Sequence, residues 1–307
     1  MARAPSLSSW IQAARPRLQV GVLVSLAYGE ALAFARHGAF SPRIALEVLV
    51  FGFLDGLLIA FSNDAVDWRT DTDNRTFTRW SGGSRVVPEG LITPFSLAQA
   101  ALLAVLALGT TGAYLAFREG RAFMVVIAAI AAHLVWLHGF SPFRLAYRGL
   151  GDLIAGIGFG VVLPVAGFYA QANTVEGLNI ATLFPAFLVG FAASVTTSVP
   201  DAPSDARAEK RTIAVRRGER TARQTSVALL FVAAFSTSLA VPGVTLPIVI
   251  VVIAIAATLL RGSIARLASG DSENREACAE FVGGNLRAAL GLYVLWGAAA
   301  VLCAGRF

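Results

Sequence analysis

The stretch FGFLDGLLIAFSNDAVDWRTD, residues 51–71, joins a long apolar segment directly to a group of carboxylates. Its first twelve residues are almost entirely apolar, and its last nine contain Asp64, Asp67 and Asp71. A membrane-spanning helix needs about 20 apolar residues to cross a hydrocarbon core of about 30 Å. The stretch therefore predicts a membrane helix that carries acidic side chains where it leaves the membrane.

The composition of the whole chain agrees with this prediction. The 307 residues are 56% hydrophobic and only 14% charged, with a mean hydropathy of +0.67, whereas soluble domains carry about 25% charged residues. We expect an all-α, polytopic membrane protein that forms one domain over residues 1–307, with about nine transmembrane helices. The expected spans are 18–35, 44–62, 91–116, 122–138, 151–171, 180–199, 225–241, 245–260 and 284–304. The seventh and eighth, separated only by VPGVTLP, could instead form a re-entrant pair.

Basic residues predict the orientation in the membrane. With a cytoplasmic N-terminus, about 20 of the 25 lysine and arginine residues lie in cytoplasmic segments, as the positive-inside rule requires. The two long loops, 63–90 and 200–224, then form a polar cap on the cytoplasmic side of a bacterial-type inner membrane. The stretch SLSSWIQAARPR, residues 6–17, predicts a short interfacial helix ended by Pro16. Because the net charge of +6 is spread over separate loops, it favours membrane lipid or an anionic substrate over nucleic acid.

The first acidic cluster predicts a metal site. If the helix continues through it, Asp64, Asp67 and Asp71 share one face and Asn63 extends that face. Three carboxylates so close together repel one another unless a cation lies between them. Hard oxygen ligands select Mg²⁺, Mn²⁺ or Ca²⁺. The stretch does not fit an EF-hand loop, because it lacks the glycine at position 6 and the downstream glutamate.

A second acidic cluster occurs in VPDAPSDARAEKRTIAVRRGER, residues 199–220. Asp201 and Asp205 are four residues apart, so they share a helix face, and a dense basic run follows them. Carboxylates followed by cations fit a polyphosphate that is bridged by metal ions. Lys210, the only lysine in the chain, is a candidate phosphate contact. A single acidic cluster is often a solvated helix cap, but two clusters that each end a span on the same side favour a shared site.

Ionisable and glycine residues inside the predicted spans offer further candidates. Glu30, Asp55 and His133 are intramembrane ionisable groups, of which Asp55 is the best candidate for a polar cavity, whereas His133 favours a packing role. A transporter built on Asp55 and Glu30 is an alternative function. It is disfavoured because transporters usually place their key charges at the membrane midplane, whereas most carboxylates of this chain cluster at the cytoplasmic mouth. The glycines in GDLIAGIGFG, residues 151–160, indicate close helix packing and not a phosphate-binding loop.

These motifs resemble those of the UbiA superfamily of membrane prenyltransferases. NDAVDWRTD, residues 63–71, matches the motif NDxxDxxxD, and DAPSD, residues 201–205, matches DxxxD. KRTIAVRRGE, residues 210–219, is similar to the stretch that follows the second motif in the family, and RPR, residues 15–17, opens the first span as it does there. GGSRVVPEGLIT and LAYRGLGD, residues 82–93 and 145–152, most resemble the menaquinone branch, the 1,4-dihydroxy-2-naphthoate prenyltransferases.

The resemblance implies helices around a central cavity and transfer of an isoprenyl group from an isoprenyl diphosphate to an aromatic, quinone-precursor acceptor. It implies that Mg²⁺, with Mn²⁺ as a possible substitute, is held by the catalytic aspartates Asp64, Asp67, Asp71, Asp201 and Asp205. The diphosphate-binding residues that it implies are Asn63, Lys210, Arg75, Arg85, Arg144 and Arg216. Asp55, Tyr147 and Asp152 are candidates for the acceptor cavity. Asp73 and Asn74 fall outside the motif and are expected only to turn the loop.

The sequence departs from the menaquinone branch at three places. The usual NN-x-R run before the second motif is replaced by residues 197–200, TSVP; the usual GLGE ends in Asp152; and the glycine before the motif lysine is Glu209. The metal aspartates are intact, but polar groups beside them are lost. An alternative function is therefore a terpene cyclase of the same superfamily, which ionises a prenyl diphosphate without an aromatic acceptor.

Overall fold

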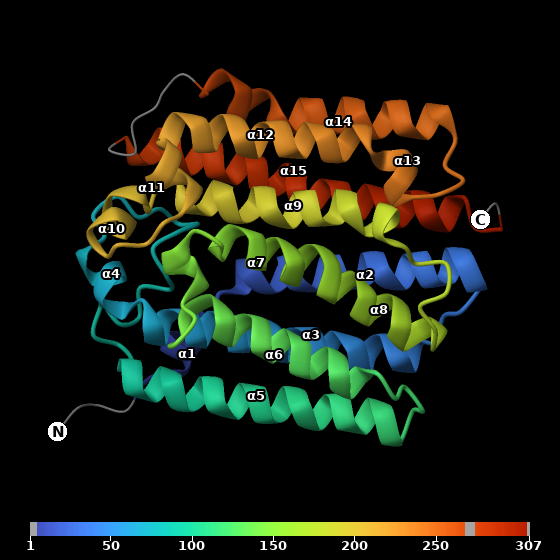
Figure 1. The fold of residues 1–307 in the computed structure, drawn as a ribbon, viewed down its shortest axis with the longest axis horizontal. Helices are drawn as coiled ribbons and strands as arrows, with labels where there is room; N and C mark the ends of the chain where they lie inside the picture. The colour runs from blue at the N-terminus through green and yellow to red at the C-terminus, as the bar shows by residue number, and fades with distance from the viewer. Residues whose placement is uncertain (1–4, 268–273, 306–307) are drawn as a thin grey trace.

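The computed structural model describes residues 5–267 and 274–305, and in this part of the chain every regular element is a helix. The long helices lie side by side, and most of the short helices gather at one end of the bundle, whereas α13 lies at the other end (Figure 1). The long helices are α2 Pro16–His37, α3 Pro42–Val66, α5 Pro94–Phe117, α6 Met124–Gly139, α7 Gly151–Ile157, α8 Leu163–Ala172, α9 Ile180–Ser198, α12 Glu219–Phe235, α14 Leu246–Ala265 and α15 Arg275–Leu302. The short helices are α1 Leu7–Ala13, α4 Trp68–Asp73, η1 Leu145–Arg148, α10 Ala202–Arg207, α11 Ile213–Arg217 and α13 Thr237–Ala240. The predicted all-α class is confirmed.

Seven of the described segments are long and apolar enough to cross a membrane. Helices α6 and α12, with 16 and 17 residues, lie at the fourth and seventh expected spans but are shorter than each of the seven apolar segments, so the number nine stays a prediction. Helices α12 and α15, at the seventh and ninth expected spans, begin earlier than expected, at residues 219 and 275, because polar turns precede their apolar residues. Helices α12 and α14 are separate and pack along each other, joined by α13.

Local sequence signals fix where several helices begin. Proline occupies the first turn of α2, α3 and α5, where its missing N–H leaves no hydrogen bond unmade. The side chains of Ser41 and Thr93 accept hydrogen bonds from backbone N–H groups at the starts of α3 and α5. Asn179 caps α9 in the same way. The helix starts are therefore encoded locally, before any tertiary contact forms.

The fifth expected span is not one regular helix. Helices α7 and α8 are separated by a π-helical turn, Gly158–Val162, just before Pro164. The glycines around this turn allow close packing, as predicted: a Cβ on Gly160 would lie 2.3 Å from the carbonyl oxygen of Ala186 in α9. The backbone carbonyl of Phe159 accepts hydrogen bonds from the hydroxyls of Ser25 in α2 and Tyr293 in α15. This turn therefore ties α2, α9 and α15 together at mid-depth.

Helices α2 and α8 make the tightest crossing in the bundle. A Cβ on Gly29 would lie 2.0 Å from the carbonyl oxygen of Pro164, and one on Gly167 would lie 2.2 Å from that of Leu26. Backbones approach this closely only where side chains are absent. Two apolar clusters meet at the crossing, one among α2, α3, α5, α6 and α8 and the other mainly among α2, α8, α9, α12, α14 and α15.

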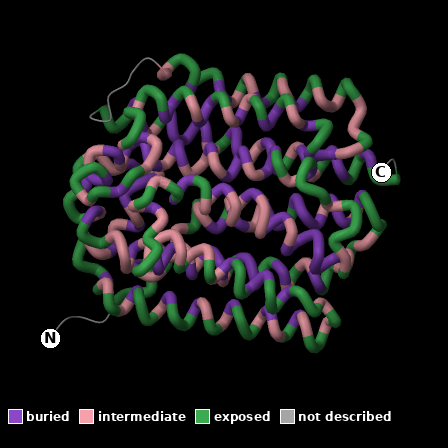
Figure 2. Tube along the Cα trace, in the orientation of Figure 1, coloured by how far each residue is buried: buried purple, intermediate pink, exposed green. Residues whose placement is uncertain are grey.

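The outer surface of the bundle is apolar, as a lipid-facing surface must be. Exposed residues concentrate on the outward sides of α5 and α14 (Figure 2), and they include Leu102, Leu103 and Leu106 on α5 and Ile250 and Val251 on α14. The apolar spans and this surface are those of an integral membrane protein. One end of the bundle is closed by α4, α10, α11 and the segment 74–93, which we call the polar cap (Figure 1).

Adding a methyl group at the α2–α8 crossing should destabilise the fold. We expect Gly29→Ala and Gly167→Ala each to cost about 1–3 kcal/mol through overpacking against backbone, measured as a lower Tm in detergent. Gly109→Ala in α5 is the matched control, because a Cβ there meets nothing within 4 Å. Equal Tm values for all three variants would show that the crossing is not tight.

Candidate active site

The two acidic motifs, which lie about 130 residues apart in the sequence, meet at the polar cap. Helix α3 ends at Val66 and α4 begins at Trp68, so the expected continuous helix is interrupted only at Asp67. The backbone hydrogen bonds Asp67 N to Asn63 O, 2.8 Å, and Asp71 N to Asp67 O, 2.9 Å, carry the helical turn through this break. Helix α10 packs against α4, which brings the second motif opposite the first.

A cavity of about 810 Å³ opens below these motifs. Residues of α2, α3, α6, α7, α8, α9 and α15 line it, together with the segment 77–85. Its walls inside the bundle are mainly apolar, and among the lining residues are Ile59, Leu134, Phe159, Val189 and Leu290. The predicted residues that line it are Asn63, Asp67, Asp71, Asp201, Asp205, Lys210, Arg85, Asp55 and Asp152. The sequence thus predicted a set of residues that the fold gathers around one cavity.

Basic side chains hold two of the aspartates of the first motif. Asp64, only 3% exposed, accepts hydrogen bonds at Oδ1 from the guanidinium of Arg15 and from the backbone N–H of Ser84, 3.1 Å away. Lys210 Nζ donates to Asp67 Oδ2 over 2.7 Å and lies 3.6 Å from Asp205 Oδ1. Arg15 and Lys210 are therefore the counter-ions of the acidic cluster, and RPR was the only sequence signal for Arg15.

Asp201 is positioned by the loop that follows α4. Its Oδ1 accepts from Asn74 Nδ2 over 2.7 Å, and its Oδ2 accepts from the backbone N–H of Gly82 over 3.1 Å. Asn74 is itself buried. The expectation that Asn74 only turns the loop was incomplete, because this residue also links the two motifs. No spacing rule reveals that link, which depends on a contact across 127 residues.

Burial raises the pKa of several carboxyls in the cap. The pKa of Asp71 rises to about 8 through burial; Arg15 opposes this rise, and the neighbouring Asp67 adds to it. Burial raises the pKa of Asp205 to about 7 in spite of Lys210, and it raises the pKa of Asp201 as well. Burial alone would lower the pKa of Lys210, but Asp67 and Asp205 together raise it. Burial therefore favours the neutral form of Asp71, Asp201 and Asp205 in the cap.

The other predicted phosphate contacts lie in different surroundings. The Arg85 guanidinium stacks on the ring of Phe77, 4.0 Å from its centroid, and donates to the backbone oxygen of Asp71. Arg144 lies over the ring of Tyr147 and lines a second, separate pocket. Arg75 and Arg216 are exposed and line neither pocket. Arg85 is therefore the arginine of this group that faces the cavity.

Asp152 lines the cap end of the cavity, whereas Tyr147, the other candidate for the acceptor cavity, lines only the second pocket. Asp152 Oδ1 accepts from Ser194 Oγ over 2.8 Å, and its Oδ2 accepts from the backbone N–H of Ile213 over 3.2 Å. Asp152 thus holds the segment that follows Lys210 against α9. The Tyr147 hydroxyl lies 3.5 Å from Asp67 Oδ1. His138, which the sequence did not single out, also lines the cavity.

The intramembrane candidates have different environments. Asp55 is buried, lines the cavity and has no hydrogen-bond partner among the residues that the structure describes. Glu30 accepts a hydrogen bond from Gln171 Nε2 over 2.9 Å. His133 packs on Trp136, with ring centroids 5.1 Å apart, and does not line the cavity. Asp55 is therefore the intramembrane group that a molecule in the cavity would meet.

The cap residues fit divalent metal ions. Asp64 Oδ2 is buried and has no hydrogen-bond partner. A Cβ on Gly83 would lie 2.1 Å from Asp71 Oδ2 and 3.0 Å from Asp64 Oδ1, so the glycine leaves room beside both carboxylates. Carboxylate oxygens are the ligands that Mg²⁺ prefers. Within residues 5–267 and 274–305, no three acidic, histidine or cysteine side chains converge on one point, and Arg15 and Lys210 pair with three of the motif aspartates.

An all-helical membrane bundle with paired aspartate motifs at one end of an apolar cavity is the architecture of a membrane prenyltransferase. The chain belongs to the UbiA prenyltransferase family, whose model matches residues 22–286. It is 29% identical over 234 residues to the 1,4-dihydroxy-2-naphthoate octaprenyltransferase of Mycobacterium tuberculosis, which covers 76% of this chain and 77% of that protein. It is 26% identical to the 2-carboxy-1,4-naphthoquinone phytyltransferase of Synechocystis, over 70% of this chain and 68% of that protein.

The fold also matches a solved structure. A UbiA homologue from Archaeoglobus fulgidus, solved with DMAPP and Mg²⁺ bound, has a TM-score of 0.64 at 14% sequence identity. The match covers 96% of this chain and 99% of that protein. At this identity the likeness establishes the shared fold.

Removing one buried carboxyl should stabilise the metal-free cap at high pH, because the cost of burying its charge disappears. Burial raises the pKa of Asp71 from 3.8 to about 8 in the folded protein. The free energy of unfolding is therefore highest at low pH, and it falls as the pH rises between these two values. We expect Asp71→Asn to raise the Tm of the metal-free protein by about 2–4 °C at pH 9. Millimolar MgCl₂ should raise the Tm of the unmodified protein and have a much smaller effect on the variant.

The matched control is Asp73→Asn, which neutralises an exposed aspartate two residues away. This variant should behave like the unmodified protein with and without Mg²⁺. Stabilisation of Asp71→Asn by Mg²⁺ to the same extent as the unmodified protein would show that Asp71 does not bind the ion.

Proposed function

We propose that this protein transfers an isoprenyl group from an isoprenyl diphosphate to an aromatic acceptor of the quinone-precursor type, in a Mg²⁺-dependent reaction within the membrane. The observation that carries the proposal is the position of the two motifs. Asp67, Asp71, Asp201 and Asp205 line the capped end of an apolar cavity whose other walls are membrane helices. A substrate with a charged head and a hydrocarbon tail matches this division.

The cap residues would divide the binding of the diphosphate among them. Asp64, Asp67, Asp71, Asp201 and Asp205 would hold Mg²⁺, or Mn²⁺ as a substitute, and the ion neutralises phosphate charge when it is bound. Lys210, Arg85 and Asn63 face the same space and would contact phosphate oxygens. Arg75, Arg144 and Arg216 lie farther out and would need to move to do so. Metal binding would also free Lys210 from Asp67 and Asp205.

The chemistry begins with cleavage of the bond between the allylic carbon and the diphosphate oxygen. The bonding electrons leave with the oxygen, which produces pyrophosphate and an allylic cation. An electron-rich ring carbon of the acceptor then forms the new C–C bond, and the ring loses a proton. The apolar walls of the cavity exclude water that would otherwise capture the cation.

The acceptor would bind near the capped end of the cavity. Tyr147, beside Asp67, and Asp152, which fixes the segment after Lys210, would shape this end. Asp55, about 13.5 Å deeper along α3 than Asp64 at 1.5 Å per residue, would lie beside the hydrocarbon tail or a deeply bound acceptor. The names of the relatives from Mycobacterium tuberculosis and Synechocystis support a bicyclic naphthoate-type or naphthoquinone-type acceptor.

The orientation that we propose places the polar cap and the N-terminus in the cytoplasm. The arginine-rich segments near residues 69–85 and 207–223 then follow the positive-inside rule. Residues 1–307 would act as a single domain with the outer helix surfaces in membrane lipid.

Loss of a motif carboxylate should abolish transfer without unfolding the protein. We expect Asp67→Ala and Asp201→Ala each to lower pyrophosphate release by a factor of about 10² or more, because each removes charge that stabilises the leaving group. The measurement is pyrophosphate release by purified protein in detergent, with Tm as the test of folding. The control variant Asp73→Ala should retain activity. EDTA should abolish the activity of the unmodified protein. Full activity in both motif variants, or in EDTA, would refute the proposal.

The same assay without an acceptor separates transferase from cyclase. A transferase should release little pyrophosphate until an aromatic acid is added, and mass spectrometry should then detect the prenylated ring. A cyclic hydrocarbon or alcohol formed from farnesyl or geranylgeranyl diphosphate alone would identify a cyclase instead.

A further inference from the structure

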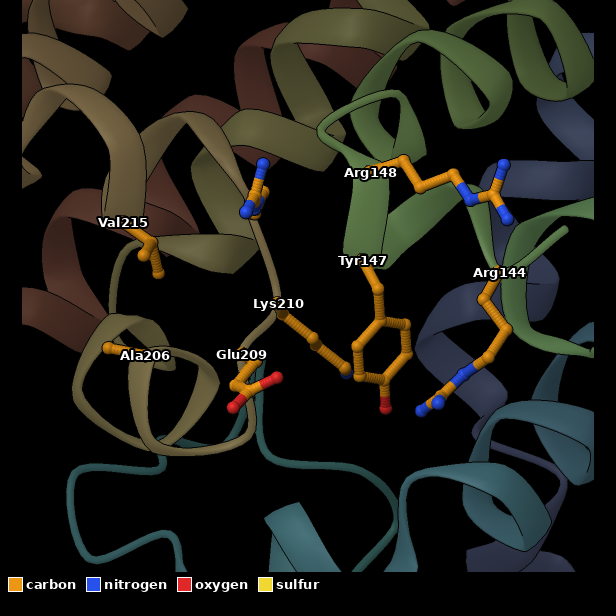
Figure 3. A pocket seen from close by; sticks show the side chains of 8 residues that line it. Arg144, Tyr147, Arg148, Ala206, Glu209, Lys210 and Val215 are labelled. Atoms are coloured by element: carbon orange, nitrogen blue, oxygen red, sulfur yellow. The ribbon is translucent and has the colours of Figure 1, made fainter.

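A second pocket of about 740 Å³ opens on the outside of the polar cap. The pocket lies between residues 144–148, at η1, and residues 206–215, which run from α10 into α11 (Figure 3). A larger share of its lining residues is basic than in the first cavity. The lining residues are Arg144, Tyr147, Arg148, Ala206, Glu209, Lys210, Arg211 and Val215. Four of these eight side chains are basic and one is acidic. The pocket therefore favours an anion with several charges.

The two pockets share Lys210. This lysine lines both, and its Nζ donates to Asp67 on the cavity side. Tyr147 stands beside Lys210 and Arg144 (Figure 3): Lys210 Nζ lies 5.8 Å from the centroid of the Tyr147 ring, and the Arg144 guanidinium lies 3.7 Å from it. The Tyr147 hydroxyl lies 3.5 Å from Asp67 Oδ1. An anion could thus pass from the aspartate motifs to the outer pocket without leaving the reach of Lys210.

The arginines of the outer pocket have capacity for a ligand. Among the described residues no carboxylate forms an ion pair with Arg144, Arg148 or Arg211. Arg148 makes one hydrogen bond, 2.9 Å, to the backbone oxygen of Pro142. Guanidinium groups bind phosphate oxygens in a bidentate manner, so these side chains suit a phosphate-type anion.

Backbone strain also marks this pocket. Arg144 and Glu209 adopt left-handed backbone conformations with φ of 43° and 61°, although neither is glycine. Five non-glycine residues in the described chain have positive φ, and four of them line one of the two pockets. Such strain tends to persist where function requires it. At Glu209 the strained conformation places a carboxylate beside Lys210 (Figure 3).

We infer that this outer pocket binds inorganic pyrophosphate as it leaves the active site. The inference rests on the proposed function, in which cleavage of the C–O bond leaves pyrophosphate beside Lys210. A multiply charged anion cannot depart through the apolar cavity, because burial of an unpaired charge is very costly. The outer pocket, with arginines beyond the shared lysine, offers a polar path to water. Glu209 repels the anion and so keeps the affinity low enough for release.

The test combines a loss and a gain of affinity. The double variant Arg148→Ala/Arg211→Ala should weaken pyrophosphate binding about tenfold or more, since it removes charge-assisted hydrogen bonds. Glu209→Gln should tighten pyrophosphate binding about two- to fivefold by removing an exposed like-sign neighbour, a gain that misfolding cannot produce. Arg220→Ala, an exposed arginine that lines neither pocket, is the control. Binding is measured by calorimetry with inorganic pyrophosphate, and product inhibition is measured in the transfer assay.

Three results would overturn the inference. The first is unchanged pyrophosphate affinity in the double variant and in Glu209→Gln. The second is a rise in KM for the prenyl diphosphate that parallels the weaker pyrophosphate binding, which would make the pocket part of the substrate site. The third is a rise in KM for the acceptor alone, which would make it an acceptor site. If the unmodified protein released no pyrophosphate from any prenyl diphosphate, the proposed function would fail, and calorimetry would still decide whether the pocket binds the anion.

Discussion

Four of the five motif aspartates line an apolar cavity and the fifth, Asp64, is buried in the same cap, and the cost of placing these charges together constrains the rest of the cap. Burial raises the pKa of Asp71, Asp201 and Asp205, so their ionised forms are disfavoured inside the cap. Arg15 and Lys210 supply part of that charge and hold Asp64, Asp67 and Asp205. Loop contacts hold the remaining groups: Asn74 and Gly82 bind Asp201, and Gly83 makes room beside Asp71. The cap is therefore arranged for a cation that the protein itself does not provide.

The membrane helices make this arrangement possible by keeping a cavity open below it. Close-packed helices usually fill the space between them, so an open cavity needs rigid walls. The α2–α8 crossing, at which Gly29 and Gly167 meet backbone atoms, and the π-helical turn held by Ser25 and Tyr293 provide such walls. Both features lie on the border between the two apolar clusters. A bundle that joined its halves through interlocking side chains at this border would leave no room for a hydrocarbon tail.

Local sequence patterns predicted the helices and the acidic motifs, but they did not predict how the motifs are supported. Apolar length and composition indicated the spans, and the spacing of Asp64, Asp67 and Asp71 indicated a shared site. The π-helical turn was not predicted, and neither were the hydrogen bonds that Ser25 in α2 and Tyr293 in α15 donate to its Phe159 carbonyl. Asn74 and Arg15 were missed as site residues because their partners are 127 and 49 residues away. Arg75 and Arg216 were selected for their charge, yet charge alone does not tell which arginines face a cavity.

Lys210 links the two sides of the site through its position and not only through its charge. It follows α10, contacts one aspartate of each motif, and lines both the apolar cavity and the cationic outer pocket. Glu209, the residue before it, places a carboxylate next to it on the outer side. The lysine therefore lies between a group of anions that attracts metal ions and a group of arginines that attracts phosphate. The substrate tail requires the membrane and the pyrophosphate product requires water, so a reaction at this place needs one path for each. Because Lys210 lines both pockets, it can contact the diphosphate in the cavity first and pyrophosphate in the outer pocket afterwards.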